Sequence, residues 1–273
     1  MHSNEMSFKR KVALITGSTR GIGLAIAKQL LTQGAFVVVN GTSLERVKET
    51  VTQLEIHAEG RVIGVAGRVE EMKTGQLLVE TAIQAFGRVD FLINNAGIVA
   101  DRMTHRMSEE EWDQVMRVHA KGTFSCTQPF IQALRESAQP GIIINMISTA
   151  GLLGTVGQIN YAAAKGAILA MTYTWAEELK SLPVRVHAVA PAALTDMTRP
   201  HVNREQKLAR EQGKELPEYW RIGSAEEVGR FVSWLLSHSV ESGTVFGING
   251  TQAVQWLKPV CVEYPFDDIQ QSP

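Results

Sequence analysis

The stretch that decides the fold is VALITGSTRGIG at residues 12–23, which leads into the amphipathic run LAIAKQLLTQG at residues 24–34. Its apolar start is typical of a strand buried on both faces in a parallel sheet. Gly17, Gly21 and Gly23 then stand at the turn into a helix, with the spacing G-x-x-x-G-x-G. Glycines let the backbone turn sharply and approach a ligand, and free N–H groups at a helix start bind phosphate. The stretch therefore predicts a strand, a nucleotide-binding turn and a helix.

The same alternation of strand and helix continues along the chain. Six further apolar, β-rich runs are FVVVN (36–40), VIGVA (62–66), VDFLINN (89–95), GIIINMIS (141–148), VRVHAVA (184–190) and TVFGING (244–250). Amphipathic stretches of helical length separate these runs, and no linker rich in proline, glycine or serine interrupts them. Seven strands that alternate with helices predict one doubly wound α/β domain with helices on both faces of the sheet.

Two segments depart from this alternation. Residues 194–222 are polar and charged, which indicates a long insertion of the kind that often forms a lid over a site. The tail after residue 250 is apolar in its first half, which predicts packing on this subunit or a neighbouring one, whereas its last eight residues are predicted to be disordered. We therefore divide the chain into a domain at residues 1–250, which includes the lid, and an extension at residues 251–273.

Composition excludes several classes of function. The 273 residues include 27 basic and 28 acidic side chains, so no field of one sign attracts nucleic acid or an anionic membrane. The only cysteines, Cys126 and Cys261, and the seven scattered histidines have no metal-ligand spacing. No apolar run reaches the length of a signal peptide or a membrane span. These features predict a soluble, cytoplasmic protein with a small-molecule partner and no metal.

The end of the second strand indicates which dinucleotide fits. A site for NAD usually places an acid there for the ribose 2′-hydroxyl, and that acid would repel a 2′-phosphate. Here the strand ends in Asn40, Gly41, Thr42 and Ser43, without an acid. Arg20, inside the glycine turn, is placed to meet the phosphate, and a solvated surface charge is the alternative interpretation. The predicted cofactor is NADP(H).

Residues 148–165, STAGLLGTVGQINYAAAK, carry the candidate catalytic groups. The i, i+4 spacing places Tyr161 and Lys165 on one face of a helix that begins near Asn160. A phenol is a poor base because its pKa is about 10, but a neighbouring ammonium and a positively charged nicotinamide ring favour the phenolate. Tyr161 can then act as a general acid or base near neutral pH. Ser148, at the end of the fifth strand, can hydrogen-bond the same substrate oxygen.

Together these motifs resemble the short-chain dehydrogenase/reductase family. TGSTRGIG (16–23), NNAG (94–97), Ser148 and YAAAK (161–165) follow that family's order and approximate spacing within residues 9–250. The resemblance implies a single Rossmann-like domain with a seven-stranded parallel sheet, assembled as a homotetramer or dimer. It also implies an oxidoreductase that interconverts carbonyl and alcohol groups.

The resemblance also implies roles for individual residues. Tyr161 would pass the proton, Lys165 would hold the nicotinamide ribose and lower the tyrosine pKa, and Ser148 would orient the carbonyl. Asn95 and Ala96 would line the nucleotide cleft, and Thr195 would meet the nicotinamide carboxamide. The full set of predicted cofactor contacts is Gly17, Ser18, Arg20, Gly21, Ile22, Gly23, Thr42, Ser43, Val69, Asn95, Ala96, Gly97, Tyr161, Lys165 and Thr195.

Three positions depart from the family's usual pattern. His119 stands where the family generally has an asparagine that distorts a helix and holds a water next to the catalytic lysine. A neutral imidazole has one donor and one acceptor and can occupy that relay, and a core histidine without a proton role is the alternative. Arg68 replaces an acid beside the adenine contact Val69, where it can stack on the purine, bind the 2′-phosphate or do nothing at the surface. Ala192 replaces a common glycine, from which we expect no loss of function.

The resemblance indicates the reaction type more closely than the substrate. Similar sequences include 3-oxoacyl-carrier-protein reductases and a histidine-bearing branch related to 3-hydroxyacyl-CoA dehydrogenases. The helix-end regions RESAQPG (135–141) and EELKSLP (177–183) carry mixed charge, whereas basic residues would be expected there to dock an acidic carrier protein. This argues against a dedicated enzyme of fatty-acid synthesis and for a free ketone, a CoA thioester or a carrier in a specialised pathway. We predict an NADPH-dependent reductase of a 3-oxoacyl thioester or a related ketone. The alternatives are an alcohol dehydrogenase working in the oxidative direction and a catalytically silent, NADP-binding regulator.

Overall fold

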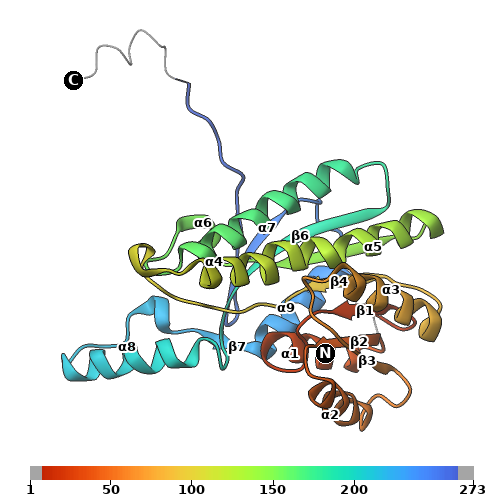
Figure 1. The fold of residues 1–273 in the computed structure, drawn as a ribbon, viewed down its shortest axis with the longest axis horizontal. Helices are drawn as coiled ribbons and strands as arrows, with labels where there is room; N and C mark the ends of the chain where they lie inside the picture. The colour runs from red at the N-terminus through yellow and green to blue at the C-terminus, as the bar shows by residue number, and fades with distance from the viewer. Residues whose placement is uncertain (1–7, 264–273) are drawn as a thin grey trace.

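We describe residues 8–263 of a computed structural model (Figure 1). One nine-stranded sheet has the order β3-β2-β1-β4-β5-β6-β8-β9, and β7 pairs with β6. The strands are β1 (Val12–Ile15), β2 (Phe36–Gly41), β3 (Val62–Ala66), β4 (Phe91–Asn94), β5 (Gly141–Met146), β6 (Val184–Leu194), β7 (Gly223–Ser224), β8 (Val245–Asn249) and β9 (Gln252–Trp256). The seven expected runs correspond to β1–β6 and β8, and they pair in parallel. The prediction of a doubly wound, Rossmann-like α/β fold is confirmed.

The prediction of seven strands was too low by two. β9 pairs antiparallel with β8, so the apolar start of the extension packs on the sheet of its own subunit. β7 contributes only Gly223 and Ser224, which pair with the end of β6. Both strands lack the signal used to find the others, because β7 is too short for a pattern and β9 is largely exposed. The predicted disorder of the last eight residues, 266–273, lies outside the described residues.

Helices cover both faces of the sheet, as predicted. They are α1 (Gly21–Thr32), α2 (Leu44–Glu55), α3 (Met72–Phe86), α4 (Glu109–Met116), α5 (Gly122–Ser137), α6 (Ala150–Leu153), α7 (Ile159–Glu178), α8 (Arg199–Glu211) and α9 (Ala225–Ser237). One apolar core joins the sheet to α1, α2 and α9, and a second joins its other face to α3, α5 and α7 (Figure 1). None of these described helices is long and apolar enough to cross a membrane.

The strand order creates a crevice at one edge of the sheet. β1 lies between β2 and β4, and the chain leaves β1 toward one side and β4 toward the other. Ligands of open α/β sheets bind at such a switch point, outside the carboxyl ends of the strands. The glycine turn follows β1, and the NNAG motif (94–97) begins at the last residue of β4. The sequence motifs therefore meet because parallel strands end at the same edge.

Candidate active site

The glycine turn between β1 and α1 packs closely against the NNAG loop. Gly17 has a φ of 61°, and a Cβ on this residue would lie 2.7 Å from Cα of Ala96. A Cβ on Gly23 would lie 2.5 Å from Nδ2 of Asn95. Gly21 has a φ of 55° and faces Thr195, whose Cγ2 is 3.6 Å from the place of a Cβ. Gly17 and Gly23 therefore let the turn pack directly against the NNAG loop, whereas Gly21 leaves room between the turn and Thr195.

Thr16 joins the ends of β1 and β4. Its hydroxyl accepts hydrogen bonds from the backbone N–H groups of Asn95 at 2.9 Å and Ala96 at 3.0 Å. The side-chain amide of Asn95 donates to the carbonyls of Thr16 at 3.0 Å and Gly17 at 3.1 Å. Asn95 thus holds the backbone of the glycine turn in place. Sequence reasoning did not single out Thr16, although a hydroxyl at the end of an apolar strand was a visible signal.

Asn40, at the end of β2, points into the protein rather than toward a ribose. Its buried side chain accepts from the N–H of Gly17 at 3.2 Å and donates to the carbonyls of Val65 at 3.1 Å and Gly67 at 3.2 Å. Ser18 is also buried, and its hydroxyl donates to the carbonyl of Ile15 at 2.6 Å. The backbone N–H of Ser18 donates to the carbonyl of Asn40 at 2.9 Å, so both its N–H and its hydroxyl are bonded within the protein, and its contact with a cofactor stays a prediction.

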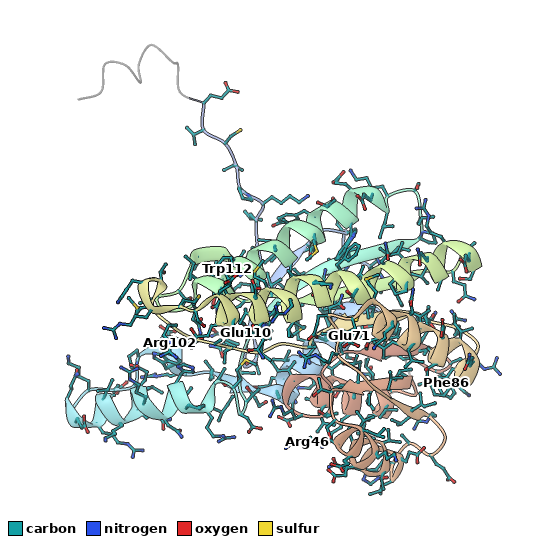
Figure 2. The ribbon with its side chains drawn as sticks, viewed as in Figure 1. Arg46, Glu71, Phe86, Arg102, Glu110 and Trp112 are labelled. Atoms are coloured by element: carbon teal, nitrogen blue, oxygen red, sulfur yellow. The ribbon has the colours of Figure 1, made fainter. Side chains whose placement is uncertain are left out.

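The region expected to hold a 2′-phosphate contains two exposed arginines. Arg20 precedes α1, and Arg46 lies in the first turn of α2 (Figure 2). Within residues 8–263 neither has an ion-pair partner. Thr42 is exposed, whereas the hydroxyl of Ser43 caps α2 by accepting from the N–H of Arg46 at 3.3 Å. Sequence reasoning missed Arg46, because a charge inside a helix looks solvated when its neighbours in space are unknown.

Arg68 and Val69 lie at the end of the crevice assigned to adenine. Arg68 pairs with Glu70 at 2.7 Å, although more than half of its side chain is exposed. Val69 is buried and packs against Gly122. A Cβ on Gly122 would lie 2.7 Å from Cγ2 of Val69. A groove of about 510 Å³ runs beside them and is lined by Ala66, Gly67, Arg68, Glu71, Lys73, Thr74, Gln76, Leu77 and Glu80. The guanidinium of Arg68 is thus held at the rim of a groove.

Tyr161 and Lys165 lie one helical turn apart near the start of α7. Nζ of Lys165 is 5.5 Å from the centre of the Tyr161 ring and donates to the carbonyl of Met146, at the end of β5, at 2.6 Å. The lysine is buried, and burial lowers its pKa to about 7. In its protonated form, an amine so placed favours the phenolate of the neighbouring tyrosine.

Ser148 follows β5, two residues after Met146, whose carbonyl accepts from Lys165. Its hydroxyl accepts from the N–H of Ala150, at the start of α6, at 3.2 Å. α6 and α7 pack very closely, because a Cβ on Gly151 would lie 2.7 Å from Cβ of Lys165. The absence of a side chain at Gly151 therefore sets the spacing between the serine-bearing segment and the lysine-bearing helix.

His119 lies in a π-helical turn, Arg117–Lys121, between α4 and α5. Its Nε2 is 2.7 Å from the carbonyl of Ile98 and 3.1 Å from that residue's N–H, so its role as donor or acceptor depends on the tautomer. Burial, followed by the charge of Lys165, lowers the pKa of His119 to about 3, which keeps the ring neutral. Its Nδ1 is buried without a hydrogen-bond partner, and its ring meets that of Tyr161 edge-on at 5.2 Å. The structure thus places His119 beside Tyr161 and Lys165, the two predicted catalytic residues. That His119 takes part in a proton relay stays a prediction.

The predicted lid follows β6 and contains α8 and a 3₁₀ turn, Glu218–Trp220. The N–H of Thr195 donates to the hydroxyl of Thr198 at 2.9 Å, which fixes the start of this segment. His201, on α8, stacks on Trp220 with ring centres 6.4 Å apart. Nε2 of His201 is also 3.5 Å from Oδ2 of Asp101, in the loop that follows the NNAG motif. The lid therefore touches the opposite side of the crevice through one histidine.

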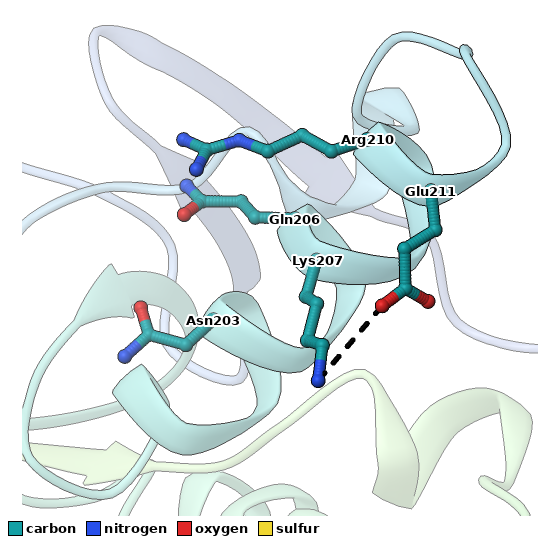
Figure 3. Close-up of a pocket in the computed structure, with 5 residues that line it drawn as sticks. All are labelled: Asn203, Gln206, Lys207, Arg210 and Glu211. Atoms are coloured by element: carbon teal, nitrogen blue, oxygen red, sulfur yellow. Dashed lines mark ion pairs between the residues drawn. The ribbon is translucent and has the colours of Figure 1, made fainter.

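A second hollow, of about 350 Å³, lies on α8 itself (Figure 3). It is lined by Asn203, Gln206, Lys207, Arg210 and Glu211. Lys207 pairs with Glu211 at 3.8 Å, and none of the predicted catalytic residues lines this hollow. Among the described residues, no group of three or more histidine, cysteine or acidic side chains is placed to hold a metal.

Comparison with known proteins decides the family. The family model for short chain dehydrogenases matches residues 11–206, which is most of the chain. The chain belongs to the short-chain dehydrogenase family. Its members are oxidoreductases, and the motifs at residues 16–23, 94–97 and 161–165 all lie within the match. The resemblance inferred from these motifs is therefore confirmed.

Several family members are similar over nearly their whole length. The chain is 38% identical to the 3-oxoacyl-(acyl-carrier-protein) reductase of Thermotoga maritima, with 90% of this chain and 98% of that protein aligned. It is 36% identical to the Aquifex aeolicus reductase of the same name, with 90% and 98% aligned. A short chain dehydrogenase from Mycobacterium avium has a crystal structure that matches with a TM-score of 0.81 at 30% identity, over 98% of this chain and 92% of that one. These similarities extend the family relationship to the sheet's last strands.

Proposed function

We propose that this short-chain dehydrogenase is an NADPH-dependent reductase of a 3-oxoacyl thioester or a related ketone. The observation that carries the proposal is the position of Tyr161 and Lys165, with Nζ 5.5 Å from the ring, at the crevice that begins with the glycine turn. The names of the Thermotoga and Aquifex relatives support the substrate class. NADPH, when bound, supplies the hydride.

The chain's own residues supply the proton and the orientation of the ketone. The hydroxyl of Ser148 donates a hydrogen bond to the ketone oxygen and orients it. Tyr161 gives its phenolic proton to that oxygen as the alcohol forms. Lys165 is held at the end of β5 by its 2.6 Å bond to Met146. When the lysine is protonated, its positive charge stabilises the resulting phenolate. His119 helps to hold the water next to Lys165 through which Tyr161 regains a proton from solvent.

The end of β2 supports the choice of NADPH over NADH. A Cβ on Gly41 would lie 2.7 Å from Cγ2 of Thr19, so an acidic side chain at this position requires Thr19 to move. Two exposed guanidinium groups supply positive charge. Arg20 belongs to the glycine turn before α1, and Arg46 belongs to the first turn of α2, which follows β2 and Thr42. Gly17 and Gly23 let the turn close against the NNAG loop, because side chains at these positions would clash with it. α1 then begins at Gly21 without a side-chain cap, so its first N–H groups are available to the phosphates of a dinucleotide. Arginine forks are well suited to phosphate.

The test is turnover with defined substrates and both cofactors. Oxidation of NADPH, and separately of NADH, is followed with acetoacetyl-CoA, a 3-oxoacyl-carrier-protein and simple diketones. We expect turnover with a thioester and a preference for NADPH that falls by about tenfold or more in Arg20→Glu and Arg46→Glu, since each change replaces an attraction by a repulsion. Turnover only with NADH would overturn the cofactor, and tight NADPH binding without turnover of any ketone would favour a silent regulator.

We also propose that the enzyme is a homo-oligomer, a tetramer or a dimer. Large apolar side chains are exposed along α4, α5 and the segment that leads into α7, and they are Trp112, Phe124, Leu153, Val156 and Ile159. α4 and α6 both pack against α7, so these side chains lie on neighbouring elements, and exposed apolar surface on neighbouring elements is often covered in the native assembly. Light scattering coupled to size exclusion measures the mass directly, and a monomer at micromolar concentration would refute the proposal.

A further inference from the structure

Asn160, the residue before Tyr161, is fully buried and engages both polar groups of its side chain. Nδ2 donates to the carbonyls of Ala100 and Glu111, each at 3.0 Å. Oδ1 accepts from the N–H of Tyr161 at 2.8 Å. Only one orientation of the amide satisfies all three contacts, because two carbonyls need donors and the N–H needs an acceptor. A buried amide that lacks these partners is strongly destabilising, so the three contacts fix the orientation of the side chain.

The three contacts join three separate segments. Ala100 belongs to the loop after β4, Glu111 belongs to α4, and Tyr161 belongs to α7. Two further bonds support the same junction. The N–H of Arg102, which is labelled in Figure 2, donates to the carbonyl of Gly157 at 2.7 Å. Its guanidinium pairs with the Glu111 side chain at 2.9 Å. Asn160 is the fully buried member of this junction, whereas the ion pair lies at the surface.

The start of α7 depends on this asparagine because it lacks an ordinary cap. The first N–H groups of any helix have no partner within the helix and are usually satisfied by the side chain of the N-cap residue. The N-cap residue of α7, Gln158, makes no such side-chain bond; its amide donates instead to Asp101 at 3.0 Å. Asn160 thus satisfies the N–H of Tyr161 from inside the first turn.

We propose that Asn160 is a positioning residue, which fixes the backbone of Tyr161 against the loop after β4. The inference rests on the proposed function of Tyr161 as the proton donor. A displacement of about 1 Å in a catalytic group can cost about 100-fold in rate, so the exact seating of the first turn matters for the reaction. Lys165, one turn further along α7, keeps its own bond to Met146 and does not replace this contact.

The first test compares Asn160→Ala with Thr172→Val. Thr172 lies on the same helix, is equally buried and makes two hydrogen bonds, to Asn145 and to the carbonyl of Ile168, but it lies three turns from Tyr161. Both variants should lose thermal stability. We expect kcat to fall about 10- to 100-fold in Asn160→Ala, with the Kd for NADPH within about twofold of wild type, and to stay near wild type in Thr172→Val. Equal kcat in the two variants would refute a positioning role.

The second test uses Asn160→Asp, which keeps the size of the side chain. One carboxylate oxygen still accepts from Tyr161, but the other faces the carbonyls of Ala100 and Glu111 and repels them. Protonation restores one donor. We therefore expect kcat of Asn160→Asp, relative to wild type, to rise between about pH 8 and pH 5.5, while the ratio for Asn160→Ala stays flat. A flat ratio for both variants would show that the carbonyl contacts do not affect the reaction.

A measurement without substrate separates this proposal from the proposed function. Hydrogen exchange followed by mass spectrometry reports the backbone of the apo protein. In Asn160→Ala we expect faster exchange in residues 99–103 and 159–162 and unchanged exchange in α9, whereas Thr172→Val should leave the first turn protected. If wild type reduces no ketone, the proposed function fails, and the exchange pattern still decides whether Asn160 holds this junction. Unchanged exchange in both segments would refute it.

Discussion

The two sides of the crevice are built in different ways. The wall that carries Tyr161, which we define as β4, β5 and α7, is held by buried polar groups that bond to one another. Nδ2 of Asn94 donates to Oδ1 of Asn145, and Nδ2 of Asn145 donates to the hydroxyl of Thr172, each at 2.9 Å. The lid, residues 194–222, meets the other side of the crevice through the 3.5 Å contact of His201 with Asp101, both partly exposed.

This difference assigns different tasks to the two sides. Breaking a bond inside a buried network leaves unsatisfied polar groups, which costs far more than losing an ion pair that water can screen. The wall therefore tolerates few substitutions without a loss of stability. The part of its network that reaches Thr172, three turns from Tyr161, supports the fold rather than the reaction. The lid can change its side chains at little cost in stability, which suits the selection of a substrate.

Removal of the Tyr161 hydroxyl should have the largest effect on the wall. In Tyr161→Phe we expect kcat to fall by about 10²- to 10⁴-fold, because the variant lacks the proton that general acid catalysis delivers. The ring still packs edge-on against His119, so the Kd for NADPH should stay near wild type. Steady-state kinetics and fluorescence titration measure both. Retention of more than a tenth of the activity would remove Tyr161 from the mechanism.

The next largest effect should be on the stability of the wall. Asn145→Ala leaves the amide of Asn94 and the hydroxyl of Thr172 each short of one buried partner, and we expect the free energy of unfolding to fall by about 2–4 kcal/mol. The matched change in the lid is Asn203→Ala, at an exposed position of α8, with an expected change within about 0.5 kcal/mol. Urea unfolding of both variants measures the contrast. Similar losses in the two variants would contradict it.

A smaller effect should appear in the dependence of stability on pH. His187, in β6 beside the wall, is buried with both ring nitrogens unpaired, and burial, followed by the charge of Arg185, lowers its pKa to about 4. The pKa of a histidine in the unfolded chain is about 6.5. Between pH 6.5 and pH 4, His187 therefore binds a proton in the unfolded chain but not in the native protein. Stability should fall as the pH drops through this window.

The variant His187→Leu tests this pH dependence. We expect its plot of unfolding free energy against pH to be less steep by up to about 1.4 kcal/mol per pH unit in the same window. His119, whose pKa is also lowered, should maintain the remaining slope. The comparison concerns slopes, so a uniform change in stability from repacking does not affect it. An unchanged slope would show that His187 takes up its proton in the native state.

The parts of the fold that the sequence predicted are those with a strong local pattern. Seven strands were found because each is an apolar run between helical stretches, and the glycine turn was found because its conformation requires glycine at Gly17 and Gly21. β9 was missed because its residues are exposed and mixed in polarity, so pairing with β8 decides its structure. An apolar run in the sequence predicts a buried strand, whereas an exposed strand such as β9 has no such run by which it could be recognised.

For the site, sequence predicted which residues gather but not how each is used. Ser18 and Ser43 were predicted to contact the cofactor, yet their hydroxyls bond to nearby backbone, as short hydroxyl side chains often do. Asp101 and His201 are 100 positions apart, so their contact depends on the fold. The roles of Asn160 and Arg46 likewise come from neighbours in space that a single sequence does not display.

The smallest effect should come from the lid contact. In His201→Ala the stacking on Trp220 and the contact with Asp101 are both lost, and we expect KM for the ketone to rise about two- to fivefold. The kcat and the Kd for NADPH should not change, because the lid contact touches neither Tyr161 nor the glycine turn. Arg204→Ala, at an exposed position on the same helix, is the control and should leave KM unchanged. A fall in kcat in His201→Ala would mean that lid and wall act together in proton transfer, and the division of tasks drawn from their construction would then be wrong.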